Sequence, residues 1–434
     1  MRFRITIKKK QTTNCIFGMI LFVIFERLLE SVGVPHSIIF LLDIANLYLF
    51  ANLLVEYKLH RLFTASIVKI HFIIFALGII VAILNGVKPQ LIIWSIRNFL
   101  RFYIFFMACV IYLNDKDIDI FYELLTIFFY INIIILLIQY AMGYRGDFLG
   151  GLFGTQTGAN TYNNILQLIL CTFYISHWFE KKSGAVKAIL VIISSLLISI
   201  ITETKVFLFE LVLIIGLSVL VIGIVERKYK VLVKGFLIGI IAACGIILSA
   251  KYIAILYPSL SNSDFMSVKG LIYILTRESG YTGSGDLNRL TAITSINKLE
   301  YFQSNLLHQL FGLGFGSAEF SSKISFLQSV FYKNYQYLHY YWFSHAWMYI
   351  ECGYLGLIGY MFGFFSNIPI GIKVVRLLKW YGKDTTAVIT GIVISIMTLL
   401  LCIYNQTLRI EIAYLLYFVF AGIYIKGKAL RING

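Results

Sequence analysis

Long apolar runs separated by short polar connections dominate this chain from end to end. A helix needs about 20 apolar residues to cross the hydrocarbon core of a bilayer. Runs near this length predict twelve membrane spans, at residues 13–30, 37–55, 66–84, 90–112, 118–142, 160–179, 187–202, 206–225, 232–254, 345–372, 385–404 and 408–425. With neither internal repeats nor low-complexity segments, the pattern favours an all-α polytopic membrane protein with one integral membrane domain over residues 1–434.

The polar connections alternate in charge along the chain. More than half of the 37 Lys and Arg residues lie in the N-terminal segment, in every second connection and in the C-terminal tail. By the positive-inside rule, these connections and both termini are expected to face the cytoplasm. The net charge of +16 is then an orientation signal, and no nucleic acid partner is expected. Residues 1–10 run directly into an apolar stretch without a cleavage site, so we expect the N-terminus to be retained.

One connection, residues 255–344, is much longer than the others and falls between the ninth and tenth predicted spans, on the outer side. Its central part has apolar residues at intervals of three or four positions, which predicts an amphipathic helix. We therefore expect this loop to form an ordered cap on the outer membrane face. The apolar positions are Leu287, Leu290, Ile293, Ile296, Leu299, Phe302, Leu306 and Leu310.

Composition supports the membrane assignment and excludes several function classes. The chain is 59% hydrophobic and 13% charged, with a mean hydropathy of +0.83, which is too apolar for a soluble domain of this length. The six cysteines lie in apolar stretches without C-x-x-C spacing, so neither a disulfide framework nor a zinc site is indicated. The chain also lacks the H-E-x-x-H, G-x-S-x-G and P-loop motifs. The sequence therefore gives no support to metalloprotease, serine hydrolase or ATPase chemistry.

Two arginines, Arg97 and Arg101, lie inside the fourth predicted span, where a charged residue costs about 3 kcal/mol on insertion. Their spacing of four places both guanidinium groups on one helix face, and a guanidinium fork matches phosphate oxygens. Two explanations remain open: the pair binds an anionic substrate, or it pairs with an acid such as Glu26 or Asp43.

His345 begins the tenth predicted span at the outer interface, where a neutral imidazole can accept a proton. A purely structural role is the alternative. Glu351 lies six residues on, about 240° around the helix, so we predict that it supports an arginine from another helix or orients His345. The aromatic segment 335–347 is either an interfacial belt or a stacking surface for sugars, with Tyr341 and Tyr349 as candidate contacts.

Two stretches in the middle of the chain resemble the O-antigen ligase and polymerase superfamily, the Wzy-type integral membrane glycosyltransferases of bacterial surface polysaccharide. GLFGTQTGANTYNNILQLIL, which contains Asn160, resembles the family's glycine-rich start of a span. ITETKVFLFELVLII resembles its Ser-Arg span start, with Lys205 where arginine is usual. Lys205 is otherwise explained as a simple interfacial lysine.

Two later stretches extend the same resemblance to residues 150–365 and agree with it in order. GDLNRLTAITSINKLEYFQSNLLHQLFGLGFGS resembles the family's loop helix that begins with Arg-Leu and ends in Gly-x-Gly-x-Gly, which places Arg289 on the functional arginine. By position alone, Arg289 would be a solvated loop residue. SHAWMYIECGYLGLIGY resembles the family's His-Asn…Glu-x-Gly segment, which places His345 and Glu351, with Ala346 in place of the asparagine.

The resemblance implies transfer of a glycan from undecaprenyl diphosphate to a sugar hydroxyl, on the outer side of the bacterial inner membrane. No metal, cofactor or nucleotide sugar is expected. His345 would be the general base of an inverting displacement, with Glu351 orienting it or an arginine. Cationic groups would neutralise the leaving diphosphate. In this assignment the catalytic residues are His345, Arg289 and Glu351, and the substrate-binding residues are Arg97, Arg101, Lys205, Asn160, Tyr341 and Tyr349.

In the preferred interpretation the chain polymerises lipid-linked repeat units, with both donor and acceptor carried on undecaprenyl diphosphate. A ligase that transfers the glycan to lipid A core is an alternative within the superfamily. From another class, a lipid-linked oligosaccharide flippase also fits twelve spans, although the single large loop breaks the two-half symmetry of a carrier. The partners expected are lipid-linked glycans, membrane lipid and a separate chain-length regulator protein.

Overall fold

In the part that the structure describes, the chain folds into helices joined by turns and loops, without β-strands. The structure is a computed structural model, and it describes residues 2–55, 65–181, 183–204, 206–226, 277, 280, 285–321 and 324–432. The helices are α1 (Arg2–Ser31), α2 (Phe40–Val55), α4 (Ser66–Leu84), α5 (Pro89–Tyr112), α6 (Asp115–Ala141), α7 (Ala159–Lys181), α8 (Ala185–Ile201), α9 (Val206–Glu226), α13 (Ala292–Ile296), α14 (Leu306–Phe311), α15 (Val330–Tyr335), α16 (Ser344–Phe365), α17 (Asn367–Trp380), α18 (Thr386–Tyr404) and α19 (Ala413–Ile432).

Nine helical stretches of the described residues are long and apolar enough to cross a membrane: Lys9–Ser31, His36–Val55, Ser66–Leu84, Pro89–Tyr112, Asp115–Ala141, Val206–Glu226, Ser344–Trp380, Thr386–Tyr404 and Ala413–Leu430. This agrees with the predicted polytopic, all-helical membrane protein. Two further predicted spans, 160–179 and 187–202, are the helices α7 and α8. Neither reaches the apolarity and length of the nine, since α8 has 17 residues and α7 buries polar side chains such as Asn163 and Gln167. The predicted span 232–254 lies outside the described residues.

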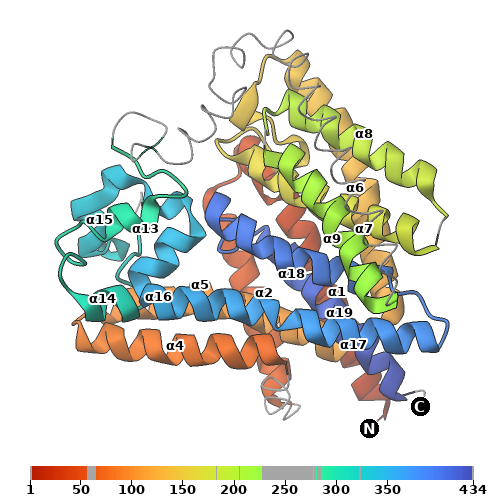
Figure 1. Cartoon of the computed structure of the whole chain (residues 1–434), viewed down its shortest axis with the longest axis horizontal. Helices are drawn as coiled ribbons and strands as arrows, with labels where there is room; N and C mark the ends of the chain where they lie inside the picture. Colours follow the sequence, from red (N-terminus) through yellow and green to blue (C-terminus); the bar gives the residue numbers. More distant parts are fainter. Residues whose placement is uncertain are drawn as a thin grey trace.

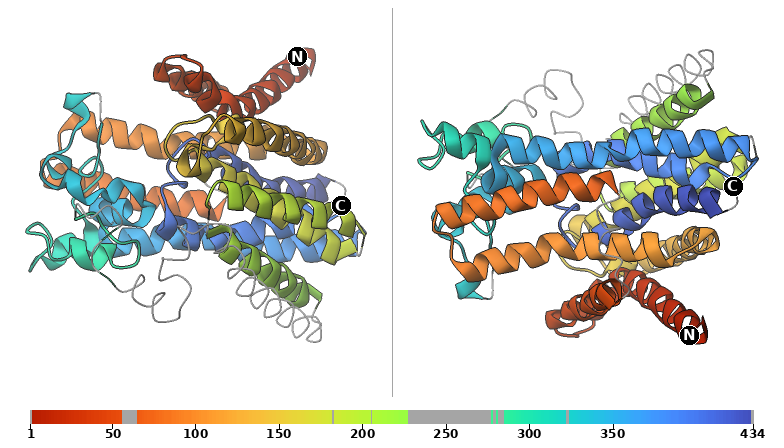
Figure 2. Two further views of the ribbon diagram at one scale, coloured as in Figure 1. Left: turned by 90° about the horizontal axis from the view of Figure 1, so that it is seen from above. Right: turned by 90° about the horizontal axis from the view of Figure 1, so that it is seen from below.

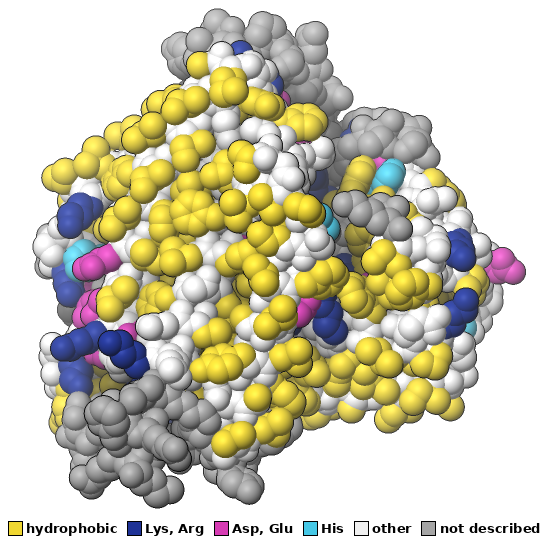
Figure 3. All heavy atoms as spheres, turned by 180° about the vertical axis from the view of Figure 1, so that it is seen from behind, with side chains coloured by type: hydrophobic (Ala, Val, Ile, Leu, Met, Phe, Trp, Pro, Cys, Tyr) yellow, Lys and Arg dark blue, Asp and Glu magenta, His cyan; other side chains and the backbone are white. Residues whose placement is uncertain are grey.

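A layer of long helices forms the centre of the molecule. Helices α4, α5 and α16–α17 run side by side, α4 packs against α16, and α19 packs against α5 and α18 (Figures 1 and 2). Helix α7 lies between α8, α9 and α18, and α1 and α2 cross on one face. Figure 3 shows an apolar surface over the middle of one face, with most charged side chains toward the two ends. This distribution fits a protein whose middle lies in lipid.

A compact cap covers one end of the helices, and we use "the cap" for residues 285–321 and 324–343. It carries α13, α14 and α15 and has its own apolar core, in which Tyr340, Phe302 and Trp347 of α16 are buried. Both chain termini lie at the opposite end (Figures 1 and 2). Of the predicted loop 255–344, the described residues fold into this cap, and the remaining residues lie outside the described part.

The amphipathic helix predicted within the cap is wrong. The segment folds instead as the five-residue α13 and the six-residue α14, joined by turns. Ser304 between them has a positive φ of 65°, which no continuous helix permits. The turn lets the Phe302 ring stack on Tyr349, with centroids 5.4 Å apart, so tertiary packing outweighs the local helical pattern.

The glycine-rich segment 312–317 packs between α16 and α4. The N–H groups of Leu313 and Gly314 donate to carbonyls of α16 at residues 350 and 351, over 2.8 and 2.9 Å. Gly353 makes this possible, because its φ of 63° breaks α16 and frees those carbonyls. A Cβ on Gly353 would lie 2.4 Å from the Leu310 carbonyl carbon. The segment therefore fastens the cap to the long helices.

Candidate functional site

Arg289 of the cap and His345 of α16 lie together at the head of one groove, which we call the His345 groove. The groove has a volume of about 430 Å³ and is lined by α16 and α18. Apart from Arg289 and His345, its lining side chains among the described residues are apolar: Leu290, Ile293, Leu357, Ile358, Met361, Phe362, Phe365, Leu399, Cys402 and Ile403. The resemblance implies that both act at one site, and the structure brings them to one groove although they lie 56 positions apart in the chain.

The C-terminal end of α18 positions both polar groups. Nδ1 of His345 lies 3.1 Å from the Cys402 carbonyl oxygen, and its ring also makes a hydrogen bond with the Arg289 backbone. The guanidinium of Arg289 donates through Nε to the Tyr404 carbonyl, over 2.9 Å, and lies 4.4 Å above the Tyr404 ring. Because the last carbonyls of a helix have no partner within it, α18 offers acceptors where the two side chains arrive.

The groove opens on the side of the molecule that the apolar helices present to lipid. Ile358 and Phe362 of α16 are 63% and 62% exposed, and Leu290 at the cap end is 50% exposed. His345 itself is only 5% exposed. The arrangement is an apolar channel with a cation and an imidazole at its cap end, which suits a ligand with a hydrocarbon chain and an anionic head.

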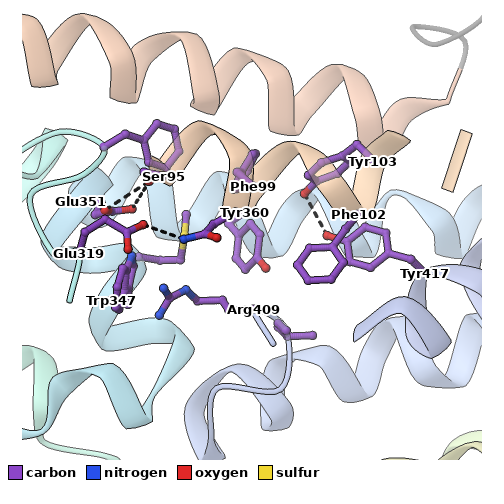
Figure 4. A pocket seen from close by; sticks show the side chains of 14 residues that line it. Ser95, Phe99, Phe102, Tyr103, Glu319, Trp347, Glu351, Tyr360, Arg409 and Tyr417 are labelled. Atoms are coloured by element: carbon purple, nitrogen blue, oxygen red, sulfur yellow. Dashed lines mark hydrogen bonds between the residues drawn. The ribbon is translucent and has the colours of Figure 1, made fainter. Parts of the chain in front are cut away.

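Glu351 does not face His345. Its Oε1 accepts the Gly316 N–H over 2.8 Å, and the hydroxyl of Ser95 lies 3.4 Å from its Oε2. It lines a separate cavity of about 30 Å³, room for about one water molecule, together with Glu319 and Arg409 (Figure 4). Of the two roles predicted for Glu351, a place beside an arginine agrees with this geometry, and that arginine is Arg409. The other role, orienting His345, does not agree with it.

Three further charged residues lie in this region that the sequence patterns did not indicate as site residues: Arg409, Glu319 and Glu411. The Arg409 guanidinium lies 3.2 Å from the centroid of the Trp347 ring. Arg409 and Glu411 fall within the predicted span 408–425, and charges inside an apolar run could have drawn attention to them. The position of Glu319 in the cap gives no such signal.

Three charged residues of this region, Glu319, Arg409 and Glu411, lie outside the candidate spans. Burial and the charges of their neighbours shift their pKa values. Burial raises the pKa of Glu319 to about 7, although the Arg409 charge acts to lower it. Burial lowers the pKa of Arg409 to about 10, against the effect of the nearby carboxylates. Burial acts to raise the pKa of Glu411, but its ion pair with Arg101 holds that pKa below the usual value. The shifts of Glu319 and Arg409 express the cost of removing a charge from water, and the shift of Glu411 expresses the effect of a nearby opposite charge.

Arg97 and Arg101 line a second groove, between α2, α4 and α5. Both arginines pair with acids of the protein. Arg97 makes a two-pronged ion pair with Asp43 of α2, with Nε 3.0 Å from the carboxylate. Arg101 donates to Glu411 over 2.8 Å and to the Arg409 carbonyl over 2.8 Å. Of the two explanations left open by the sequence, pairing with acids is therefore present in the structure.

The remaining predicted site residues are scattered. Asn160 at the start of α7 donates to Asp147 over 2.6 Å. Tyr341 stacks on Phe320 in the cap, with centroids 4.3 Å apart. Tyr349 is buried and donates to Asn297. None of the three lines either groove. Lys205 lies outside the described residues.

No model of a known protein family matches this chain, and none of the curated proteins matches its sequence. Among the described residues, no cluster of three or more His, Cys, Asp or Glu side chains is arranged to hold a metal ion. The candidate site therefore has to be interpreted from its own geometry.

Proposed function

We propose that this protein is a membrane glycosyltransferase that polymerises lipid-linked oligosaccharide repeat units, as the resemblance in its sequence implies. The observation that carries the proposal is the meeting of Arg289 and His345 at the head of one apolar, laterally open groove. A polyprenyl chain would occupy the groove, and its diphosphate would lie at the cap end beside Arg289. In this proposal the cap end faces the outside of the bacterial inner membrane, and both termini face the cytoplasm.

The reaction in this proposal is a direct displacement at the anomeric carbon. The acceptor hydroxyl oxygen forms the new bond as the bond between the anomeric carbon and the diphosphate oxygen breaks, and the configuration inverts. Because the Cys402 carbonyl can only accept, Nδ1 of a neutral His345 carries the ring proton. In this proposal Nε2 is the atom that takes the hydroxyl proton. Arg289 stabilises the negative charge that develops on the leaving diphosphate.

Glu351 has a positioning role here. Its contact with the Gly316 N–H ties segment 312–317 of the cap to α16, which fixes the cap above the helix that carries His345. The ligase alternative uses the same donor chemistry with another acceptor. In the flippase alternative Arg97 and Arg101 are the substrate cations, and their ion pairs with Asp43 and Glu411 leave that alternative with less support.

The test is an assay of the purified protein in lipid nanodiscs, with one synthetic polyprenyl-diphosphate-linked repeat unit as substrate. We expect the wild type to produce a ladder of longer glycans. His345→Ala is expected to lower the rate by about 100-fold or more, because a positioned general base contributes a factor of this size. The products are separated by gel and by mass spectrometry.

His308→Ala is the matched control, since His308 lies in the same cap but binds the Tyr301 carbonyl and lines neither groove. It is expected to retain the wild-type ladder. A wild-type protein that extends no substrate contradicts the proposed function. An unchanged ladder from His345→Ala contradicts the role given to that residue alone.

A further inference from the structure

The small cavity beside Glu351 lies where the cap meets the long helices, and we call it the carboxylate cavity. Glu319 reaches it from the cap, Glu351 from α16, and Arg409 from the connection between α18 and α19 (Figure 4). The two glutamates are 2% and 1% exposed. Because the cavity has room for about one water molecule, its charges are held away from bulk solvent.

Both carboxylates accept hydrogen bonds that cross between the cap and the helices. Oε1 of Glu351 accepts the N–H of Gly316 in the cap over 2.8 Å. Oε1 of Glu319 accepts from the side-chain amide of Asn98 on α5 over 3.1 Å. Together with the backbone hydrogen bonds of segment 312–317 to α16, these contacts hold the cap against the helices.

The charges around the carboxylate cavity do not balance when both glutamates are ionised. Arg409 is the one cation among the described residues that line the cavity, and it faces two acids. Arg97 and Arg101 on the neighbouring α5 already form ion pairs with Asp43 and Glu411. One proton shared by the two carboxylates restores neutrality. Since an unbalanced charge in a dry site is costly, the attached cap favours the protonated pair.

The other titratable groups around the cavity keep one charge state near neutral pH. Buried tyrosine and cysteine side chains are neutral there, and arginine side chains are charged. Neither His345 nor His71 lines the cavity. The pair of Glu319 and Glu351 is therefore the group that titrates, and burial raises the pKa of Glu319 to about 7 against the effect of Arg409. The neighbours of the pair come from each element packed against it: Arg97, Arg101 and Tyr103 from α5, Tyr340 from the cap, Cys352 and Tyr360 from α16, Arg409 from the connection, and Tyr417 from α19.

We propose that the carboxylate cavity is a proton-dependent latch for the cap. With one proton on the pair of Glu319 and Glu351, the cap is held on α5 and α16. Without that proton, the equilibrium shifts toward a loosened cap in which water reaches the second negative charge. Because the cap also carries Arg289, opening of the latch moves Arg289 away from His345. The inference concerns the attachment of the cap and does not rest on the proposed function.

The direction of the pH dependence follows from the number of protons that each state holds. A glutamate in contact with water has a pKa of about 4.3, whereas the pKa of Glu319 in the attached cap is about 7. Between these two values the attached cap holds one proton more than the loosened cap. The latch therefore weakens as the pH rises through this range, by up to about tenfold in the opening equilibrium per pH unit. Above about pH 7 both states have lost the proton, and the pH dependence levels off.

The test is hydrogen–deuterium exchange of the full-length protein in lipid nanodiscs, measured by mass spectrometry from about pH 5 to about pH 9, a range that includes the levelling point. Segment 312–319 measures the opening, because the N–H groups of Leu313, Gly314 and Gly316 donate across the junction. After correction for the intrinsic pH dependence of exchange, we expect its protection factor to fall by up to about tenfold per pH unit and to level off above about pH 7. The buried helix α18 is the internal reference and should show no such fall. A protection factor of the segment that stays constant or rises, or that falls equally in α18, overturns the inference.

Variants test the assignment to the carboxylate pair. Glu319→Gln keeps an oxygen that accepts from Asn98 but has no proton to lose, and it leaves one carboxylate opposite Arg409. Its protection factor is expected to stay near the low-pH value of the wild type across the whole range. Glu351→Gln balances the charges in the same way and is expected to lose the pH dependence as well, so the test stands if one of the two variants does not fold.

Glu300→Gln is the matched control, since Glu300 is an exposed acid of the same cap. It should keep the pH dependence of the wild type. Wild-type pH dependence in the folded Glu319→Gln or Glu351→Gln protein, or its loss in Glu300→Gln, contradicts the assignment. The exchange experiment contains no substrate, so its failure leaves the proposed glycan extension standing, and failure of glycan extension leaves the latch standing.

Discussion

At the residue scale, several charged side chains of this protein are buried between apolar helices. Arg101 and Glu411 are 5% and 9% exposed, and Glu351 is 1% exposed. Each such group is costly to remove from water, and the cost is offset by an opposite charge nearby. Arg101 has Glu411 as its partner, whereas the carboxylates Glu319 and Glu351 share the charge of Arg409.

We therefore expect Arg409→Met to destabilise the protein by about 3 kcal/mol, because it leaves two facing carboxylates without a cation. Thermal unfolding in detergent, followed with a thiol-reactive dye that reports exposure of buried cysteines, measures the effect. Arg376→Met is the control, since Arg376 is an exposed residue of α17. Equal unfolding temperatures for the two variants would show that the charge of Arg409 is not needed for stability.

At the element scale, the break in α16 decides how the cap is attached. The helix is interrupted at Gly353, and the two carbonyls freed just before it accept hydrogen bonds from Leu313 and Gly314. Further along, Gly359 and Gly363 let α4 approach closely, since small residues permit close packing of membrane helices. Helix α16 therefore carries His345, provides the carbonyls that anchor the cap, and packs closely against α4.

Gly353→Ala is expected to lower stability by about 1–3 kcal/mol, the usual cost of a strained backbone. The reason is that the new Cβ would meet the Leu310 carbonyl in a backbone conformation that favours glycine. The same thermal assay measures this, and limited proteolysis should show faster cleavage in the cap. Gly216→Ala in α9 is the comparison, because nothing lies within 4 Å of its Cβ position. Similar behaviour of both variants would exclude the break in α16 as the anchor of the cap.

At the scale of the whole molecule, the cap and the termini lie at opposite ends of the helices. The proposed function requires the cap end to face outward, since lipid-linked glycans are extended on that side in the resembled family. Tyr337 of the cap and Trp380 at the other end are 47% and 85% exposed, so both positions suit chemical labelling.

In a background with Cys15 and Cys244 changed to serine, we expect Tyr337→Cys to react with a membrane-impermeant maleimide in intact spheroplasts. Trp380→Cys should react only after the membrane is permeabilised. Mass-tag gel shifts measure both. Labelling of both variants in detergent controls for folding, and the reverse pattern in spheroplasts would place the His345 groove on the wrong side for the proposed reaction.

Several features of the fold and the site could be predicted from single residues and their spacing. Runs of apolar residues indicated the helices, and the position of His345 at the head of α16 follows from the start of its apolar run. Arg97 stood out because a charge within such a run is costly. The partner of Arg97 could only be suggested, since Asp43 lies on another helix.

The all-helical, polytopic membrane class could be predicted from the sequence alone, because apolar length and local charge act over neighbouring residues. Contacts between polar groups far apart in the chain depended on the folded arrangement of the helices. The tertiary structure broke the predicted cap helix at Ser304, inserted segment 312–317 between α16 and α4, and brought Arg289 to His345. These outcomes depend on packing between residues distant in the chain, where burial and hydrogen bonding outweigh local preference.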